Sequence, residues 1–246
     1  MRVLVACEES QTVCKAFRER GFEAYSCDLQ ECSGGHPEWH IKDDIKNVVT
    51  DNWDLMIAHP PCTHLATSGA KHFEQKRKDG RQKSAIDFFM FFTNTKIPHV
   101  AIENPMGIMN TVYRKPDQIF HPYHFGDPAQ KTTCLWLFNL PKLTATHYDA
   151  PLFGESVNKG EFYEFTTKKG IKKRQPMWFV KGFFNAANTD ERMKNRSFRF
   201  PGFAKAIVKC SVFSCGAFKT LKINTDGKIY CTSRWSNCLY YWLQRR

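Results

Sequence analysis

The chain has 246 residues, of which 42% are hydrophobic and 14% aromatic, so it can bury a substantial core and is not a disordered polymer. Lysine and arginine number 36 against 24 acidic residues, and the net charge of +12 favours a polyanionic partner, most simply nucleic acid, over a merely basic soluble protein. No apolar run approaches the ~20 residues of a membrane span, and the N-terminus does not resemble a signal peptide, so we expect a cytoplasmic protein without a membrane partner.

The first half of the chain alternates strand and helix signals. Short apolar runs predict strands at 2–7, 22–26, 40–45, 53–58 and 97–102. Helical spacing predicts helices at 10–20, 46–52 and 71–95. Ser10 is the expected N-cap of the first helix and Gly21 its closing residue. This β-α-β rhythm predicts an α/β fold with a doubly wound, mostly parallel sheet.

The second half is less regular. An apolar run predicts a strand at 133–138, and residues 200–208 suggest a short loop leading into a helix. The polar, basic segment 145–195 shows no clean period and predicts loops. In the tail, alternating residues on both sides of Thr225-Asp226-Gly227 predict a β-hairpin.

These patterns suggest a division of the chain into parts. We expect an α/β core over 1–145, a short basic insert over 146–199, a helix over 200–209 that packs back on the core, and a small β appendage over 210–246. The appendage carries four cysteines whose gaps do not fit common zinc sites, so we predict no metal there. The ten cysteines of the chain are scattered through α/β patterning, which favours reduced thiols.

The most informative stretch is His59-Pro60-Pro61-Cys62-Thr63-His64, which follows a buried apolar run. Two prolines end the strand and stiffen its exit, so one thiol is held at the carboxyl end of a strand, where open α/β sheets bind ligands. Glu103-Asn104-Pro105 follows a later strand in the same way. A thiol and a carboxylate presented side by side suggest covalent catalysis.

Simpler interpretations exist for each of these residues. Cys62 could be a buried structural cysteine, and Glu103-Asn104-Pro105 alone could be an ordinary turn. His59 and His64 are expected to be loop histidines rather than metal ligands, because no cysteine or histidine lies nearby at zinc spacing. The joint order of the two segments favours the catalytic interpretation.

Together the Pro61-Cys62 dipeptide and the Glu103-Asn104 pair resemble the signature of S-adenosylmethionine-dependent DNA cytosine-C5 methyltransferases, in their short phage and prophage form. The resemblance covers roughly residues 1–208 and implies a class I methyltransferase fold, which is Rossmann-like. It implies that Cys62 adds to C6 of cytosine, that Glu103 contacts N3, and that Asn104 positions the loop. It also implies a role in DNA modification or restriction evasion by a phage.

The resemblance also implies a site for S-adenosylmethionine. Asp28 would bind the ribose hydroxyls and Asp44 the adenine amino group, although acids after strands often cap the next helix instead. Phe203 and its helix resemble the segment that closes the family's cofactor site. The full set of expected cofactor residues is Ala6, Cys7, Glu8, Ser10, Asp28, Leu29, Asp44, Ile45 and Pro60.

The expected substrate is a cytosine flipped out of double-stranded DNA, with RNA as an alternative. Lysines and arginines between 71 and 83, and again between 168 and 174, would suit phosphate contacts, although a charge run of this kind is often a solvated helix face. The expected substrate residues are Pro61, Thr63, His64, Lys71, Arg81 and Lys131.

The sequence departs from the family in three places. The first loop has Glu8-Glu9 where the family has glycines, Thr63 replaces a common glutamine, and Lys131 stands where an arginine is usual. Alternatives therefore include an amino-methyltransferase acting on adenine N6 or cytosine N4, and a nucleic-acid-binding relic without activity. His59 and Cys62 stand where an amino-methyltransferase would carry an acid or amide and an aromatic residue, which counts against it.

Overall fold

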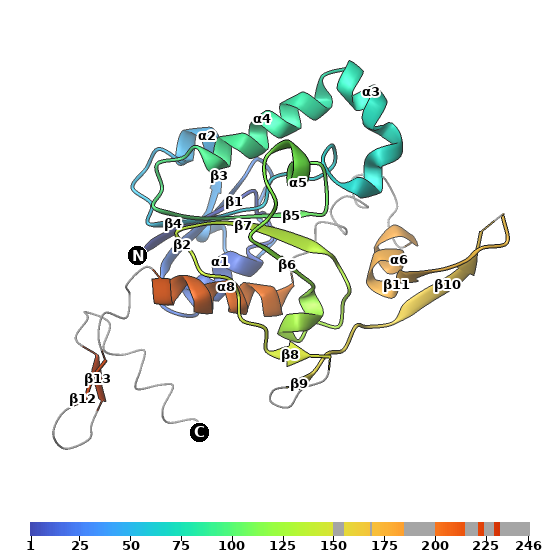
Figure 1. Ribbon diagram of the computed structural model, residues 1–246. Coiled ribbons are helices and arrows are strands. Elements are labelled where there is room, and N and C mark those ends of the chain that lie inside the picture. The colour runs from blue at the N-terminus through green and yellow to red at the C-terminus, as the bar shows by residue number, and fades with distance from the viewer. Residues whose placement is uncertain (150–154, 168, 185–199, 215–220, 224–228, 232–246) are drawn as a thin grey trace.

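The computed structural model describes residues 1–149, 155–167, 169–184, 200–214, 221–223 and 229–231 (Figure 1). Its centre is a seven-stranded sheet in the order β3-β2-β1-β4-β5-β7-β6. The strands are β1 (Arg2–Ala6), β2 (Glu23–Asp28), β3 (His40–Lys42), β4 (Leu55–Ala58), β5 (His99–Pro105), β6 (Gln118–Phe120) and β7 (Thr133–Phe138). Strands β1 to β5 run parallel, and β7 is antiparallel to both of its neighbours. The predicted doubly wound, mostly parallel fold is confirmed.

Helices cover both faces of this sheet (Figure 1). On one face lie α1 (Thr12–Arg18) and α8 (Pro201–Ser214), with Phe17 and Phe203 in their apolar cluster. On the other lie α2 (Ile45–Val48), α4 (Arg81–Thr93) and α5 (Met109–Val112), with Phe89 and Phe92 in theirs. Because both faces are covered, β4 is buried at every residue, which explains its unbroken apolar sequence.

Shorter elements complete the described chain. They are η1 (Pro37–Trp39), η2 (Thr67–His72), α3 (Phe73–Lys78), η3 (Pro122–Phe125), β8 (His147–Tyr148), β9 (Glu155–Ser156), β10 (Phe162–Thr166), β11 (Lys172–Pro176), α6 (Met177–Phe184), β12 (Leu221–Ile223) and β13 (Ile229–Cys231). Strands β12 and β13 pair antiparallel, so the predicted tail hairpin is confirmed, while its Thr225-Asp226-Gly227 turn lies outside the described residues. Within the described residues, no helix is long and apolar enough to cross a membrane.

The predicted first helix was wrong at its start. Helix α1 begins at Thr12 rather than Ser10, and its N-cap residue is Gln11, whose side chain makes no capping hydrogen bond. Instead, the carboxylate of Glu8 accepts hydrogen bonds from the backbone N–H groups of Val13 and Cys14, at 2.8 and 3.1 Å. The cap therefore comes from a residue further back in the chain. Gly21 does close the helix region, with a φ of +78° that favours glycine.

The predicted helix over 71–95 is broken in two. Helix α3 ends at Lys78 and α4 begins at Arg81, because Gly80 between them adopts a φ of +79°. A residue in the left-handed region cannot continue a right-handed helix. The break lets the two helices meet at an angle, which matters for the loop after β4.

The segment predicted as loops over 145–195 contains secondary structure. Strands β10 and β11 form an antiparallel ribbon that projects away from the sheet, followed by α6 (Figure 1). Most ribbon residues are exposed on both faces, so the alternation of apolar and polar residues that marks a half-buried strand is missing. The edge strand β6 was also missed, because three residues carry too little pattern.

Helix α8 is fixed to the core through its first turn. The carboxylate of Asp127 accepts a hydrogen bond from the backbone N–H of Gly202 at 2.9 Å, and the helix packs against α1. Gly202 permits this contact, since a Cβ there would lie 2.2 Å from the carbonyl oxygen of Phe125. Burial raises the pKa of Asp127, although the backbone N–H groups of Gly202 and Phe203 oppose this effect.

We predict that Asp127→Ala lowers the free energy of unfolding by about 1 kcal/mol, because α8 loses its N-terminal acceptor. Asp127→Asn keeps an acceptor without the buried charge and should lose less. Urea unfolding of the three proteins measures the difference, with Asp87→Ala on the exposed face of α4 as the control, expected within about 0.5 kcal/mol of the parent. Equal losses for Asp127→Ala and Asp87→Ala would contradict the assigned cap.

Candidate functional site

The carboxyl ends of β4 and β5 bring the Cys62 loop and Glu103 into neighbouring positions. The two strands pair in parallel, with Ala58 opposite Ile102, so the residues that follow each partner lie at the same edge. The side-chain amide of Asn104 donates a 2.7 Å hydrogen bond to the carbonyl oxygen of Pro60, and both residues are buried. Such a buried bond contributes about 1 kcal/mol and fixes the spacing of the two segments.

Glu103 and Asn104 lie inside β5 rather than just past it. The antiparallel partner β7 extends the strand, with Glu103 opposite Leu135 and Asn104 opposite Cys134. The prediction that the strand ends before Glu103 was therefore wrong. Its consequence is favourable for a site, because a carboxylate on a paired strand is held more rigidly than one on a loop.

Hydrogen bonds hold most of the backbone carbonyl groups in the loop from Pro60 to Ala66. Cys62 accepts hydrogen bonds from the N–H groups of Leu65 and Ala66. The Lys76 ammonium donates to the carbonyl oxygen of Thr63 at 2.7 Å, and the Gln82 amide donates to that of His64 at 3.4 Å. Both donors are buried. The angle between α3 and α4 allows one residue from each helix to reach this loop.

The loop also pairs with the segment after β5. Ala66 and Gly107 form an antiparallel bridge, in which Ile108 N–H donates to Leu65 and Thr67 N–H donates to Met106, each at 3.0 Å. The chains approach closely because residue 107 is a glycine. A Cβ there would lie 2.3 Å from the Leu65 carbonyl oxygen, which a backbone atom cannot avoid without moving the loop.

Glu103 has a partner that the sequence did not identify. His59 Nδ1 lies 3.0 Å from Glu103 Oε2, and the two side chains are 0% and 8% exposed. The ring of Phe203 meets the His59 ring edge-on, with centroids 6.4 Å apart. His59 lies outside regular secondary structure, directly after β4, as predicted, but its buried side chain packs between β5 and α8. Its position immediately after a buried strand was the available signal.

A small pocket, partly open to solvent, lies beside Glu103. It is lined by Glu103, Lys131, Thr133, Phe120, Pro122, Phe200 and Phe203. One carboxylate and one ammonium in a largely aromatic wall suit a planar polar ring. The Lys131 ammonium lies 5.8 Å from the centroid of Phe200, so the cation is held at the rim by an aromatic face.

Cys62 is half-buried on the loop after β4 and is not among the residues that line this pocket. Burial raises the pKa of Cys14 and of Cys27 to about 12 and raises that of Cys134, so these three remain protonated thiols near neutral pH. The half-buried cysteines in the described chain are Cys7, Cys32, Cys62 and Cys210. Of these, Cys62 lies on the loop tied to Glu103.

The other predicted substrate residues differ in exposure. Pro61 and Thr63 are exposed beside Cys62, whereas His64 is half-buried. Burial lowers the pKa of His64, and the nearby Lys76 and Arg81 lower it further, so this histidine is neutral near pH 7. Lys71 is exposed on η2.

The basic stretch before α4 is largely engaged within the protein. Arg81 pairs with Asp79, Lys78 with Glu74 and Lys83 with Asp87. Lys76 is buried, so it is unsuited to phosphate contact and holds the loop instead. Lys71 and Arg77 make no ion pair with any residue that the structure describes, which leaves them as the exposed cations of this surface.

The first loop keeps a backbone shape for which glycine is ordinarily used. Cys7 and Gln11 have φ angles of +59° and +57°, in the left-handed region. Each such residue costs about 1–2 kcal/mol when it is not glycine, so the surrounding contacts must hold it. Gln11 is fully buried and bonds to the backbone N–H and carbonyl of His36. The family's glycines are absent, but the turn that they would permit is present.

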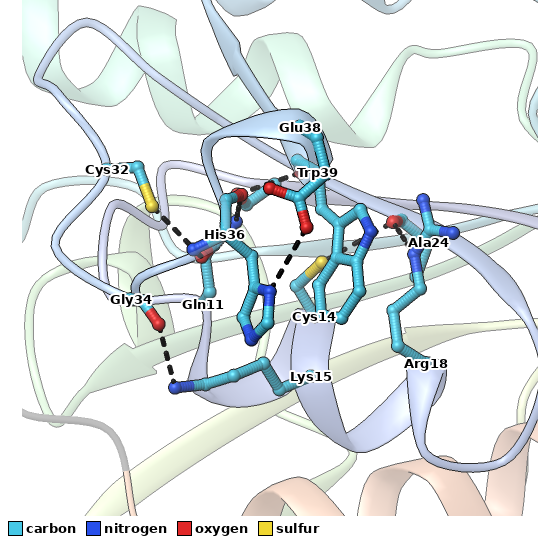
Figure 2. Close-up of polar contacts among 11 residues, drawn as sticks. Gln11, Cys14, Lys15, Arg18, Ala24, Cys32, Gly34, His36, Glu38 and Trp39 are labelled. Atoms are coloured by element: carbon cyan, nitrogen blue, oxygen red, sulfur yellow. Dashed lines mark hydrogen bonds and ion pairs between the residues drawn. The ribbon is translucent and has the colours of Figure 1, made fainter.

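Gln11 also fixes the loop that follows β2. Figure 2 shows its side chain between Cys32 and His36, while Lys15 bonds to the carbonyl of Gly34 at 3.2 Å. Gly34 is required at that point, because a Cβ would lie 2.6 Å from the Ser10 carbonyl oxygen. These hydrogen bonds hold the segment after Asp28 against the turn between β1 and α1.

The buried carboxylate of Glu8 restricts what this turn can bind. In doubly wound dinucleotide sites a phosphate sits at the N-terminus of the first helix and bonds to its backbone N–H groups. Here the backbone N–H groups of Val13 and Cys14 already donate to the Glu8 carboxylate, and Glu8 is only 2% exposed. A phosphate at that position would meet a fixed negative charge, so the turn disfavours a dinucleotide cofactor.

The remaining predicted cofactor residues occupy the same edge. Asp28 is half-buried at the end of β2, and the adjacent Leu29 is 71% exposed, which leaves an apolar side chain uncovered. Asp44 accepts a hydrogen bond from Lys46 N–H and so N-caps α2, as the simpler interpretation predicts. Ala6, Ile45 and Pro60 are buried, and Ser10 is half-buried with its hydroxyl 3.3 Å from that of Thr12.

Comparison with known proteins gives structural likenesses only. No family model matches the chain, and no curated protein matches it. An E. coli protein, assigned as a DNA modification methyltransferase encoded within a prophage, is 14% identical with a TM-score of 0.42, covering 74% of this chain and 63% of that one. The S. pombe Dnmt2 methyltransferase is 15% identical with a TM-score of 0.39, covering 58% of this chain and 51% of that one. At these values the likenesses identify neither the family nor the activity of this chain, which aligns with roughly half to two thirds of each.

We predict that Gly107→Ala lowers the free energy of unfolding by about 1–3 kcal/mol, because its Cβ displaces the Leu65 carbonyl. Gly80→Ala is the control, since Gly80 also has φ above zero but a Cβ there would meet nothing within 4 Å; it should lose only about 1 kcal/mol. Urea unfolding gives the energies, and hydrogen exchange at Thr67 and Ile108 reports the bridge. If exchange at these amides stays slow in Gly107→Ala, the role assigned to the close approach at the Ala66–Gly107 bridge is wrong.

Proposed function

We propose that the protein is an S-adenosylmethionine-dependent methyltransferase that modifies C5 of cytosine in DNA. The observation that carries the proposal is the tie between two segments: the Cys62 loop is bonded to Asn104 of β5 and pairs through Ala66 with Gly107 just after that strand, so a thiol and Glu103 share one edge of the sheet. The pocket beside Glu103, with its aromatic wall and the Lys131 ammonium, supports a heterocyclic base as the ligand.

The residues at the carboxyl edge fit the cofactor. An adenosine needs an apolar surface for its base and a carboxylate for its ribose hydroxyls, and exposed Leu29 beside Asp28 offers both. Asp44 keeps one carboxylate oxygen in its helix cap and would contact the adenine amino group with the other. When bound, S-adenosylmethionine supplies an electrophilic methyl group on sulfur. The Glu8 carboxylate at the start of α1 supports a cofactor without phosphates over a dinucleotide.

The chain's own residues would activate the base. Cytosine C5 is a weak nucleophile, and addition of the Cys62 thiolate to C6 makes it electron-rich like an enamine. Negative charge then develops toward N3, where Glu103 would hold or donate a proton. Lys131, at the rim of the same pocket, would stand near the cytosine carbonyl. Pro60 and Pro61 stiffen the loop that presents the sulfur.

The nucleic acid would bind over the exposed cations. Lys71 and Arg77 flank the Cys62 loop, and the β10–β11 ribbon carries Lys172, Lys173 and Arg174 on exposed positions. A two-stranded ribbon is narrow enough to enter the major groove of DNA, and its projection from the core supports the recognition role expected for 146–199 (Figure 1). Lys168, expected to contribute there, lies outside the described residues.

The test is trapping of the covalent intermediate. Duplex DNA carrying 5-fluorocytosine, incubated with the protein and cofactor, should give an adduct that survives denaturing electrophoresis, since fluorine blocks loss of the C5 proton. Cys62→Ser should abolish the adduct, while Cys210→Ser, another half-buried thiol, should retain it. An amino-methyltransferase would methylate ordinary DNA without an adduct, and a binding relic would transfer no labelled methyl. An adduct on RNA alone would exclude DNA as the substrate.

A second prediction separates the positioning lysine from its exposed neighbour. Lys76→Met removes the donor to the Thr63 carbonyl, so we expect the methyl-transfer rate at saturating DNA to fall about 10–100-fold because the thiol is misplaced. The salt dependence of DNA binding should not change. Arg77→Gln removes an exposed cation, so DNA affinity should fall and the slope of log affinity against log salt should decrease by about 0.9. A reduced slope in Lys76→Met would contradict its assignment as a structural donor.

A further inference from the structure

The hydrogen bond between His59 and Glu103 joins two buried titratable side chains at the candidate site. It joins Nδ1 of the ring to Oε2 of the carboxyl at 3.0 Å, with both side chains nearly or fully out of solvent. A histidine is not needed there for packing alone, because an apolar ring would fill the same space without a polar contact. The pair therefore places a proton acceptor against the carboxyl group that lines the pocket.

Several groups in the described chain lie close to the pair. Phe203 of α8 packs edge-on against the His59 ring. Lys131, which leads into β7, lines the pocket with Glu103 and is the nearby cation. Cys134 of β7 is close enough for Glu103 to raise the pKa of its thiol, and burial keeps that thiol protonated. Asn104 is engaged with Pro60. On the loop side, His59 is thus a titratable hydrogen-bond partner of Glu103.

We propose that His59 is the positioning residue that keeps a proton on the His59–Glu103 pair near neutral pH, so that Glu103 can deliver it to N3 of the cytosine. This inference rests on the proposed function. A lone glutamic acid has an ordinary pKa near 4.3 and a lone histidine one near 6.5. A pair that shares its protons titrates as a unit, so the histidine extends the pH range in which the unit holds the transferable proton.

The proton that Glu103 gives to N3 is returned to it within one turnover. With two exchangeable protons, the pair is either imidazolium with carboxylate or imidazole with carboxylic acid, and both forms are neutral overall. When Cys62 Sγ bonds to C6, the electron pair of the C5–C6 double bond moves through C5 and C4 to N3, and N3 takes the proton from Glu103. After C5 has accepted the methyl group and lost its own proton to a base, the C6–S bond breaks. N3 then returns its proton to Glu103.

The decisive measurement is the pH dependence of the single-turnover methyl-transfer rate in His59→Asn, using unmethylated genomic DNA and S-adenosylmethionine carrying a labelled methyl. Asparagine can still place an amide near Glu103 Oε2 but cannot bind a proton. We expect the rate of His59→Asn to be a few-fold below that of the parent near pH 5 and roughly 100-fold below it above pH 7. This ratio follows from the difference between the two reference pKa values. A deficit that is the same at every pH would overturn the proposal, because a merely structural role predicts it.

The matched control is His99→Asn, at the start of β5, the strand that carries Glu103; Nδ1 of His99 bonds to the Asn139 carbonyl at 2.9 Å. Its rate profile should follow that of the parent. A readout independent of activity is the ¹⁵N NMR titration of the histidines in the parent protein, which remains available if His59→Asn does not fold. The His59 titration should shift to lower pH in Glu103→Gln, and an unchanged titration would overturn the proposal.

Failure of the proposed function gives a different result. If the parent protein forms no 5-fluorocytosine adduct and transfers no methyl group to C5, both proposals fall. If the parent does both and His59→Asn follows the parent pH profile after scaling, only the role of His59 falls. Wrong assignment of His59 therefore leaves a working methyltransferase, whereas wrong assignment of the reaction does not.

Discussion

The candidate site depends on the clamp between the loop after β4 and strand β5. Prolines alone stiffen only two residues of that loop, and the hydrogen bonds do the rest: Asn104 holds Pro60, Lys76 holds Thr63, and the Ala66–Gly107 bridge holds the exit. Each bond contributes about 1 kcal/mol, but together they leave the loop few alternative conformations. Such a loop keeps its backbone conformation without help from a ligand, and this preorganisation would suit the nucleophilic role that we propose for Cys62.

The clamp explains why buried polar residues occur on α3 and α4. Lys76 and Gln82 are buried polar side chains on these two helices, and a buried amine without a partner would be strongly destabilising. Both are satisfied by carbonyl oxygens of the Cys62 loop. The break at Gly80 sets the angle that lets both reach it. A basic helical surface that suggests DNA contact therefore includes one lysine whose role is internal.

In the turn between β1 and α1, hydrogen bonds offset an unfavourable backbone conformation. Its left-handed residues, Cys7 and Gln11, are not glycines and carry a conformational cost of about 1–2 kcal/mol each. The cost is offset because Gln11 is buried and bonded to His36 in the segment that follows β2. It is also offset because the Glu8 carboxylate accepts hydrogen bonds from the first turn of α1. The turn therefore forms without glycines at these positions. The end of its helix is already occupied by a carboxylate rather than open to a phosphate.

The sequence by itself determined the succession of the first five core strands along the chain, the mostly parallel sheet, and the placement of the Cys62 and Glu103 segments at one edge, because unbroken apolar runs and proline exits are local signals. Only the tertiary structure decided that Glu103 lies within β5, since that depends on pairing with a strand some thirty residues later. The His59–Glu103 bond, the Glu8 cap and the Lys76 contact were likewise beyond local pattern. Each joins residues through the packing of separate elements, and a side chain's partner across such a contact leaves no periodicity in the chain.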